Sequence, residues 1–228
     1  MKTIMLIMLL VPALVAPREI RAGDAPSGVK KAKEIVGKMA AAYAGIESYR
    51  TDTEVQEYRN GRLAETQRFL YTFRKPDHIR LDMKSPHPGL ILVYPNKQGK
   101  ATVKPGGWGG FLRFNLSLDS GFLKNSTGQR LNETDFGLLI RNIRHSITDG
   151  RQGDVKIAME NGLILVQVLA DDHFRSGSKT RYRFFVDSQL WLPAEVEEFT
   201  PDGIIKRRVI FRNVRTSIPA SEDIFRIE

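Results

Sequence analysis

The stretch from Tyr182 to Val214 constrains the fold of this chain more than any other feature. It reads YRFFVDSQLWLPAEVEEFTPDGIIKRRVIFRNV, with three strand-like runs separated by turn signals at residues 187–189 and 200–203. In the first run, side chains that favour burial recur at every second position, which is typical of a sheet with one buried face. Pro201 presets the φ angle of a turn, and Gly203 tolerates positive φ. We therefore predict three adjacent antiparallel strands.

Similar runs occur along the rest of the chain and predict about ten antiparallel strands. Asn60-Gly61 and Asn161-Gly162 are strong hairpin signals, because these residue types accept positive φ. Two helices are predicted, at residues 29–45 and 134–147, because apolar side chains recur there at helical spacing. Thr134 is the expected cap of the second helix. The fold class is thus α+β, mainly β.

A sheet with so many strands must curl or close. We predict a curled antiparallel sheet, a half-open β-barrel covered by two or more helices. Helix 134–147 has a continuous apolar stripe and can plug the concave face. A loose fit of this plug would leave a hydrophobic cavity.

Residues 105–130 are the least regular part of the sequence. The glycines around Trp108 lead into FLRFNLSLDS rather than into a helix, which argues against a phosphate-binding loop. Two interpretations stay open for this segment. It is either a mobile apolar loop over a cavity or an irregular loop anchored by Trp108.

The first residues fit a secretory signal peptide, with Lys2 followed by an apolar run from Ile4 to Ala16. We expect residues 1–22 to be the signal peptide, with cleavage after Ala22, and residues 23–228 to form a single domain in the periplasm.

There is no cysteine, which excludes disulfides and thiol catalysis. The formal net charge is +9, which suits an anionic membrane surface. The basic residues are dispersed without an aromatic-basic module, so nucleic acid is not expected.

No pattern in the sequence predicts catalysis, a metal or a cofactor. The four histidines do not have the spacing of metal ligands, and no GxSxG signature occurs. Glu195 and Glu197 share a strand face and could form a carboxylate pair. They fit better as part of a charged outer face opposite arginines of neighbouring strands. We therefore expect no enzyme.

The C-terminal strands resemble those of the LolA/LolB superfamily of envelope lipoprotein carriers. The matching positions are Asp187, Leu192, Pro193, Asp202, Gly203, Phe211, Asn213 and Val214. The N-terminal half is similar to a related family of uncharacterised exported bacterial proteins, through ESYRTDTEVQEYRNGRL, FRKPDHIRLDM and GGWGGFLRFNLSLD. This resemblance implies a half-open β-barrel with helices as its lid, holding acyl chains or a lipidated protein. The superfamily also includes sensor domains.

We therefore expect a periplasmic carrier, acting as a monomer, whose partner is a lipid acyl chain or a lipidated protein. The predicted ligand-binding residues on the sheet are Phe69, Tyr71, Phe73, Leu81, Met83, Leu92 and Tyr94. Those on the helical lid are Phe136, Leu139, Ile140 and Ile143. Each of them could instead fill an ordinary core.

An envelope sensor or protein-interaction module is the alternative, and it predicts an exposed patch without an internal cavity. A hydrolase would need a polar cluster in the cavity, with perturbed carboxylates around Glu195 and Glu197.

Overall fold

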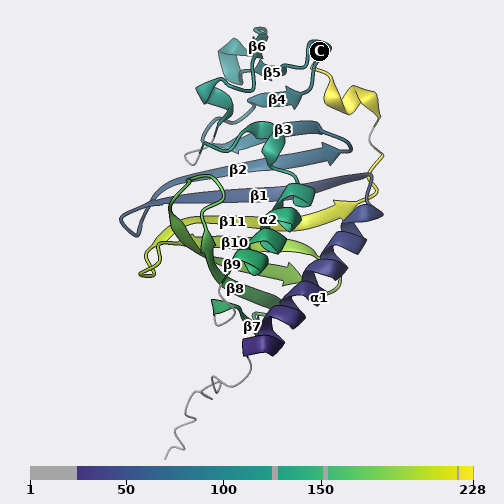
Figure 1. Ribbon diagram of the computed structural model, residues 1–228. Coiled ribbons are helices and arrows are strands. Elements are labelled where there is room, and N and C mark those ends of the chain that lie inside the picture. The colour runs from purple at the N-terminus through teal and green to yellow at the C-terminus, as the bar shows by residue number, and fades with distance from the viewer. Residues whose placement is uncertain (1–24, 125–127, 151–153, 220, 228) are drawn as a thin grey trace, which may run out of the picture.

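The computed structural model describes residues 25–124, 128–150, 154–219 and 221–227. Two α-helices and eleven strands lie in this part of the chain (Figure 1). The helices are α1 (Ala25–Ala44) and α2 (Phe136–Asp149). The strands before α2 are β1 (Ser48–Arg59), β2 (Arg62–Arg74), β3 (His78–Ser85), β4 (Ile91–Tyr94), β5 (Ala101–Lys104) and β6 (Phe114–Leu116). Those after it are β7 (Lys156–Glu160), β8 (Leu163–Asp171), β9 (Lys179–Asp187), β10 (Leu192–Phe199) and β11 (Ile205–Thr216).

All eleven strands form one antiparallel sheet in the order β6-β5-β4-β3-β2-β1-β11-β10-β9-β8-β7. Each half of the sheet is a meander of hairpins, and the two halves meet where β1 pairs with β11. This pairing joins the first strand to the last strand of the described chain. Glu57 lies opposite Arg207, and Val55 lies opposite Val209. The predicted fold class is confirmed, including the meander β9-β10-β11.

The hairpin turns follow from local residue types. Asn60 and Gly61 both have positive φ between β1 and β2, as do Asn161 and Gly162 between β7 and β8. Asparagine and glycine tolerate this conformation at low cost, so the predicted hairpins form where the sequence placed them.

The helix ends differ from the prediction. The structure begins α1 at Ala25 and ends it at Ala44, before Gly45. Helix α2 is capped by Asp135, whose carboxylate accepts a hydrogen bond from the backbone N–H of Leu138. The predicted cap, Thr134, is wrong, because its hydroxyl instead donates to the carbonyl of Leu131. Aspartate competes well for this position, since its charge also interacts favourably with the helix dipole.

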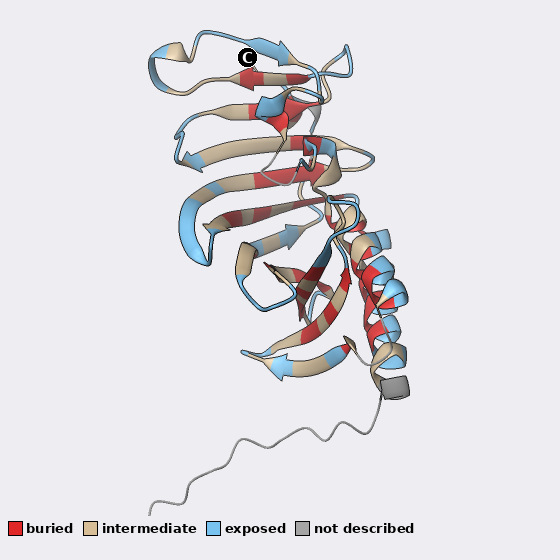
Figure 2. Ribbon diagram, turned by 60° about the vertical axis from the view of Figure 1, so that its left-hand side comes forward, coloured by how far each residue is buried: buried red, intermediate tan, exposed pale blue. Residues whose placement is uncertain are grey.

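Both helices lie on one face of the sheet and pack against each other. Helix α1 contacts β7 and β10, and α2 contacts β8 and β10. Figure 2 shows buried residues on the sides of the helices that face the sheet and exposed residues on their outer sides. No helix in the described ranges is both long and apolar enough to cross a membrane.

The core consists of two hydrophobic clusters. The first joins α1, α2 and strands β8 to β10, around Met39, Ile143 and Phe184. The second joins strands β1 to β5 with the segment before α2, around Tyr49 and Phe73. Phe211 packs against both clusters. The helices therefore cover one half of the sheet, and the segment that leads to α2 covers part of the other half.

The glycine-rich segment is the main departure from prediction. Trp108 is 99% exposed, so the interpretation that Trp108 anchors this loop is wrong. The residues that follow form the additional edge strand β6, which pairs with β5. The three-residue strand carries no strong periodic signal, because three residues are too few to show alternation. After β11, the described chain contains a short 3₁₀ helix at Glu222–Phe225.

Candidate functional site

A pocket opens between the helix-covered face of the sheet and helix α2. It encloses a cavity of about 130 Å³. Most of its exposed wall is apolar, from side chains of α2 and of strands β1, β2, β3, β9, β10 and β11. The apolar residues that line it are Val55, Phe69, Leu81, Leu131, Phe136, Leu139, Phe174, Phe184, Val196, Val209 and Phe211. An apolar cavity of ~150 Å³ is large enough to take a benzene ring.

The alternation of strand residues explains why this face is apolar. On β1, Thr51, Thr53 and Val55 line the pocket, while Asp52 and Glu54 between them point to the opposite face. The same alternation on β11 places Val209 and Phe211 in the pocket. A period of two thus separates an apolar face from a charged face along the same strands.

Hydrogen bonds fix the N-terminal end of α2 over the pocket. The hydroxyl of Tyr49 accepts from the backbone N–H of Phe136 at 3.0 Å. The hydroxyl of Tyr43, on α1, donates to the Asp135 carboxylate, also at 3.0 Å. Burial raises the pKa of the Tyr43 hydroxyl, and the neighbouring Asp135 carboxylate raises it further. Both tyrosines therefore stay protonated, and the end of α2 is held by neutral hydroxyl groups.

Near the other end of α2, His173 joins the helix to the loop after β8. Its Nε2 lies 2.7 Å from the hydroxyl of Ser146, and its ring stacks on Tyr182 at 4.4 Å. Burial lowers the pKa of His173 to about 4, although the nearby Asp172 carboxylate opposes this shift. The imidazole is therefore neutral at pH 7. Ser146 is 1% exposed, so this serine–histidine pair connects two elements and does not present a nucleophile to the pocket.

The wall of the pocket becomes charged near the start of β11, where Arg207 lies. The guanidinium of Arg207 lies 3.2 Å from the Glu57 carboxylate and 3.7 Å from the Glu198 carboxylate. Burial raises the pKa of Glu198, and Arg207 partly offsets this effect. Next to this group, Lys206 donates to Asp172 at 2.9 Å.

The structure brings five of the predicted ligand-binding residues together in the pocket. They are Phe69, Tyr71, Leu81, Phe136 and Leu139. The other predicted residues lie outside the pocket wall. Phe73, Leu92 and Tyr94 are buried in the second cluster, Ile140 and Ile143 are buried in the first, and Met83 is half-buried on β3.

Several pocket residues were not predicted, and they come from strands far apart in the sequence. Thr53, Val209 and Phe211 meet only because β1 pairs with β11. Alternation within each strand could have placed them on the buried face. Their position beside α2 depends on the long-range pairing, which a single sequence does not reveal.

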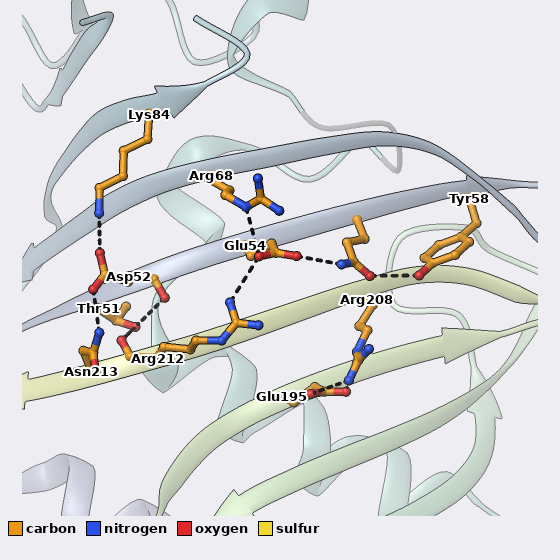
Figure 3. A network of polar contacts seen from close by, with 11 residues as sticks. Thr51, Asp52, Glu54, Tyr58, Arg68, Lys84, Glu195, Arg208, Arg212 and Asn213 are labelled. Atoms are coloured by element: carbon orange, nitrogen blue, oxygen red, sulfur yellow. Dashed lines mark hydrogen bonds and ion pairs between the residues drawn. The ribbon is translucent and has the colours of Figure 1, made fainter. Parts of the chain in front are cut away.

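The carboxylate pair predicted for a hydrolase, Glu195 and Glu197, lies on the opposite face of the sheet. Glu195 accepts two hydrogen bonds from Arg208, at 2.6 and 3.0 Å, and Glu197 pairs with Arg183 at 2.6 Å. Figure 3 shows the continuation of this network, in which Glu54 accepts from Arg68 and Arg212. Neither Glu195 nor Glu197 lines the pocket. The cross-strand ion pairs follow the predicted arrangement.

In the run Asp171-Asp172-His173, the side chains of Asp172 and His173 are also engaged in contacts within the protein. The Asp172 carboxylate accepts from Thr180, Lys206 and two backbone N–H groups. Burial acts to raise the pKa of Asp172, but these hydrogen bonds outweigh it and lower the pKa to about 2. Within the described residues, no cluster of three histidine or acidic side chains could hold a metal ion.

No protein-family model and no curated protein sequence matches this chain. Solved structures do match it. An uncharacterised conserved protein from Thermus thermophilus is 8% identical with a TM-score of 0.52, over 87% of this chain and 94% of that one. This match shows a shared fold.

Two further matches have lower TM-scores. MucB is 14% identical with a TM-score of 0.48, and the match covers 87% of this chain but only 63% of the MucB chain. A LolA superfamily protein from Nitrosomonas europaea is 10% identical with a TM-score of 0.38, over 86% of this chain and 97% of that one.

Proposed function

We propose that this protein binds the acyl chain of a lipid or of a lipidated protein and carries it through the periplasm. The observation that supports this function is the apolar pocket between the sheet and α2. Each methylene group moved from water into such a pocket contributes ~0.8 kcal/mol. An acyl chain can thus be held by apolar contact alone, and binding requires no chemical reaction of the ligand. The expectation that the protein is not an enzyme forms part of this proposal.

Helix α2 is the proposed lid. Leu139 lines the pocket and is half-buried, whereas Ile143, one turn further along, is 1% exposed in the core beneath α1. The lid is therefore divided into residues that would contact a ligand and residues that hold the helix in place. Opening the pocket would break the hydrogen bonds of Tyr49 and Tyr43 to the start of α2.

The proposal is tested by native mass spectrometry of the protein purified from its own envelope, followed by lipid extraction. We expect a co-purifying acylated species that is lost in the Leu139→Asp variant. Leu63→Asp is the matched control, because Leu63 is 55% exposed on β2 and outside the pocket. Both variants should keep the circular dichroism spectrum of the parent protein. A protein that is purified without ligand and takes up no lipid in vitro would contradict the carrier function.

An exposed apolar patch suggests where the ligand is exchanged. Trp108 and Phe111 are 99% and 79% exposed, and Leu112, Phe114 and Phe122 are also exposed. Residues 97–130 contain six lysines and arginines but only one acidic residue, Asp119. Aromatic side chains favour the interface of a bilayer, and basic residues favour anionic lipid. We propose that residues 108–122, here called the aromatic patch, contact an anionic membrane surface.

The second candidate is an envelope sensor or protein-interaction module on the same scaffold. The aromatic patch favours this function as well, because exposed apolar patches commonly mark protein interfaces. The interaction module was expected to lack an internal cavity, whereas the structure has one beside α2. Crosslinking in the envelope would distinguish the two functions, since a stable protein partner captured through Trp108 would favour the interaction module.

A further inference from the structure

Two residues that line the pocket carry buried polar atoms that the protein itself does not satisfy. Among the residues that the structure describes, three buried side-chain polar atoms have no hydrogen-bond partner. Two of the three, the hydroxyl of Thr53 and Nε of Arg207, belong to residues that line the pocket. Buried polar groups in proteins are nearly always paired, so such atoms need an explanation. A ligand that fills the pocket would supply one.

Thr53 lies on the apolar floor of the pocket. It is 6% exposed and sits opposite Phe211 on β11 and Phe69 on β2. The neighbouring Thr51 is satisfied, because its hydroxyl donates to the carbonyl of Arg212. Thr53 is therefore a hydrogen-bonding group amid aromatic side chains, where valine would pack equally well.

Arg207 lies further along the same floor. It is opposite Glu57 on β1, and the pair Val55 and Val209 separates it from the level of Thr53. Its Nε is close enough to Glu57 for an ion pair, at 3.2 Å, but does not form a hydrogen bond with it. A guanidinium has five N–H donors, so Arg207 can keep its two acidic neighbours and still bind another acceptor.

A second cavity begins where the apolar pocket ends. It has a volume of about 280 Å³ and shares Glu198 and Arg207 with the first pocket. It is lined by four basic residues, namely Arg59, Arg175, Lys206 and Arg207, and three acidic residues, namely Glu57, Glu65 and Glu198. The two cavities together offer an apolar compartment that leads into one lined by charged residues, in which Arg59 and Arg175 add to the positive charge of Arg207.

We infer that the ligand is an anionic amphiphile, with its alkyl chain beside Phe69 and Leu139, its negatively charged head group at Arg207, and an oxygen atom that accepts from Thr53. This inference rests on the proposed function and assigns the chemical class of the ligand. A carboxylate and a phosphate share the chemistry that Arg207 recognises, because both accept charge-assisted hydrogen bonds from a guanidinium.

Three probes test the inference by isothermal titration or fluorescence. Dodecanoate and dodecyltrimethylammonium have the same chain with opposite charge, and N-phenyl-1-naphthylamine is apolar and uncharged. We expect dodecanoate to bind at least about tenfold more tightly than the cation, as a charge-assisted hydrogen bond would give. Dodecyl phosphate, compared with dodecanoate, distinguishes the two kinds of anionic head group.

Two variants separate the polar contacts from the apolar ones. Thr53→Val has nearly the same shape and should weaken lysophosphatidate with a dodecanoyl chain roughly fivefold, as expected for one lost hydrogen bond to its ester oxygen. It should leave the naphthylamine unchanged, and also dodecanoate, whose only oxygen atoms lie at Arg207. Arg207→Gln should remove the preference for the anion. Because Arg207→Gln leaves Glu57 and Glu198 without their partner and could unfold the protein, Thr53→Val keeps the test independent of it.

The outcomes distinguish this inference from the proposed function. If the naphthylamine binds but dodecanoate binds no better than the cation, the anionic head group is wrong and the apolar carrier function stands. The same follows if Arg207→Gln does not affect dodecanoate and Thr53→Val does not affect the lysophosphatidate. If none of the three probes binds the folded protein, the carrier function itself is contradicted.

Discussion

The hydroxyl of Tyr49 on β1 accepts a hydrogen bond from the backbone N–H of Phe136, and the two rings stack with their centroids 4.4 Å apart and their planes 5° from parallel. Tyr49 is fully buried. The contact joins the centre of the sheet to the first residue of α2. It therefore fixes the point from which the proposed lid extends over the pocket.

Tyr49→Phe should destabilise the protein by about 1–3 kcal/mol, because the buried N–H of Phe136 loses its acceptor while the ring stacking is kept. The free energy of unfolding in urea measures this change. Tyr58→Phe is the control, since the Tyr58 hydroxyl donates to Gln56 on the open face, where water can replace it. Equal stability losses in the two variants would argue against a special contribution of the Tyr49 contact.

Gly137 and Gly37 should respond in opposite directions to alanine. A Cβ atom at Gly137 would lie 2.6 Å from both the Tyr43 ring and the Asp135 carboxylate, so Gly137→Ala must displace the contact that joins α1 to α2. We expect a loss of roughly 1–3 kcal/mol. A Cβ at Gly37 meets no atom within 4 Å, and Gly37→Ala should stabilise α1 by ~0.5–1 kcal/mol. Thermal unfolding of both variants checks the pair.

His173 should make stability depend on pH between its folded and unfolded pKa values. Its pKa is lowered to about 4 in the folded protein, mainly by burial, from an ordinary value of 6.5. The unfolded chain therefore binds more protons in this interval, and the contribution of His173 to stability is present above pH 6.5 and is lost as pH falls toward 4. The loss amounts to ~3.5 kcal/mol at most, since the two pKa values differ by about 2.5 and each pKa unit corresponds to about 1.4 kcal/mol.

The variant His173→Gln isolates this contribution from that of the carboxylates. Glutamine can still hydrogen-bond to Ser146 but does not titrate. The difference in unfolding free energy between parent and variant should shift with pH between 4 and 6.5 and be constant above. A constant difference across the whole range would show that protonation of His173 is not coupled to folding.

Trp108→Ser and Phe111→Ser should weaken binding to vesicles of phosphatidylglycerol and phosphatidylcholine. Both side chains are exposed, so the variants should keep the stability of the parent protein. We expect a several-fold loss in a sedimentation assay, and weaker binding of the parent protein as salt is raised, because the basic residues of this segment act through screened charges. Leu63→Ser, exposed on β2, is the control. Equal binding of all variants would exclude the aromatic patch as the membrane contact.

The sequence determined the local structure of this protein. Alternation with a period of two identified the strands, the Asn-Gly pairs identified hairpins, and the stripe of helix α2 identified its buried side. These patterns are local, because a strand or a helix repeats its geometry every few residues. The sequence also placed Glu195 and Glu197 on the charged face, since neighbouring positions on a strand point to opposite sides.

Only the tertiary structure decided which apolar residues border the pocket and which fill the core. Tyr71 and Phe73 share one face of β2, yet Tyr71 lines the pocket, whereas Phe73 packs under Tyr49. The difference depends on where α2 begins above the sheet and on the pairing of β1 with β11. Both are contacts between distant parts of the chain, and alternation along one strand carries no information about them. The same pairing places the unsatisfied atoms of Thr53 and Arg207 along one floor, where they point to the chemistry of a ligand.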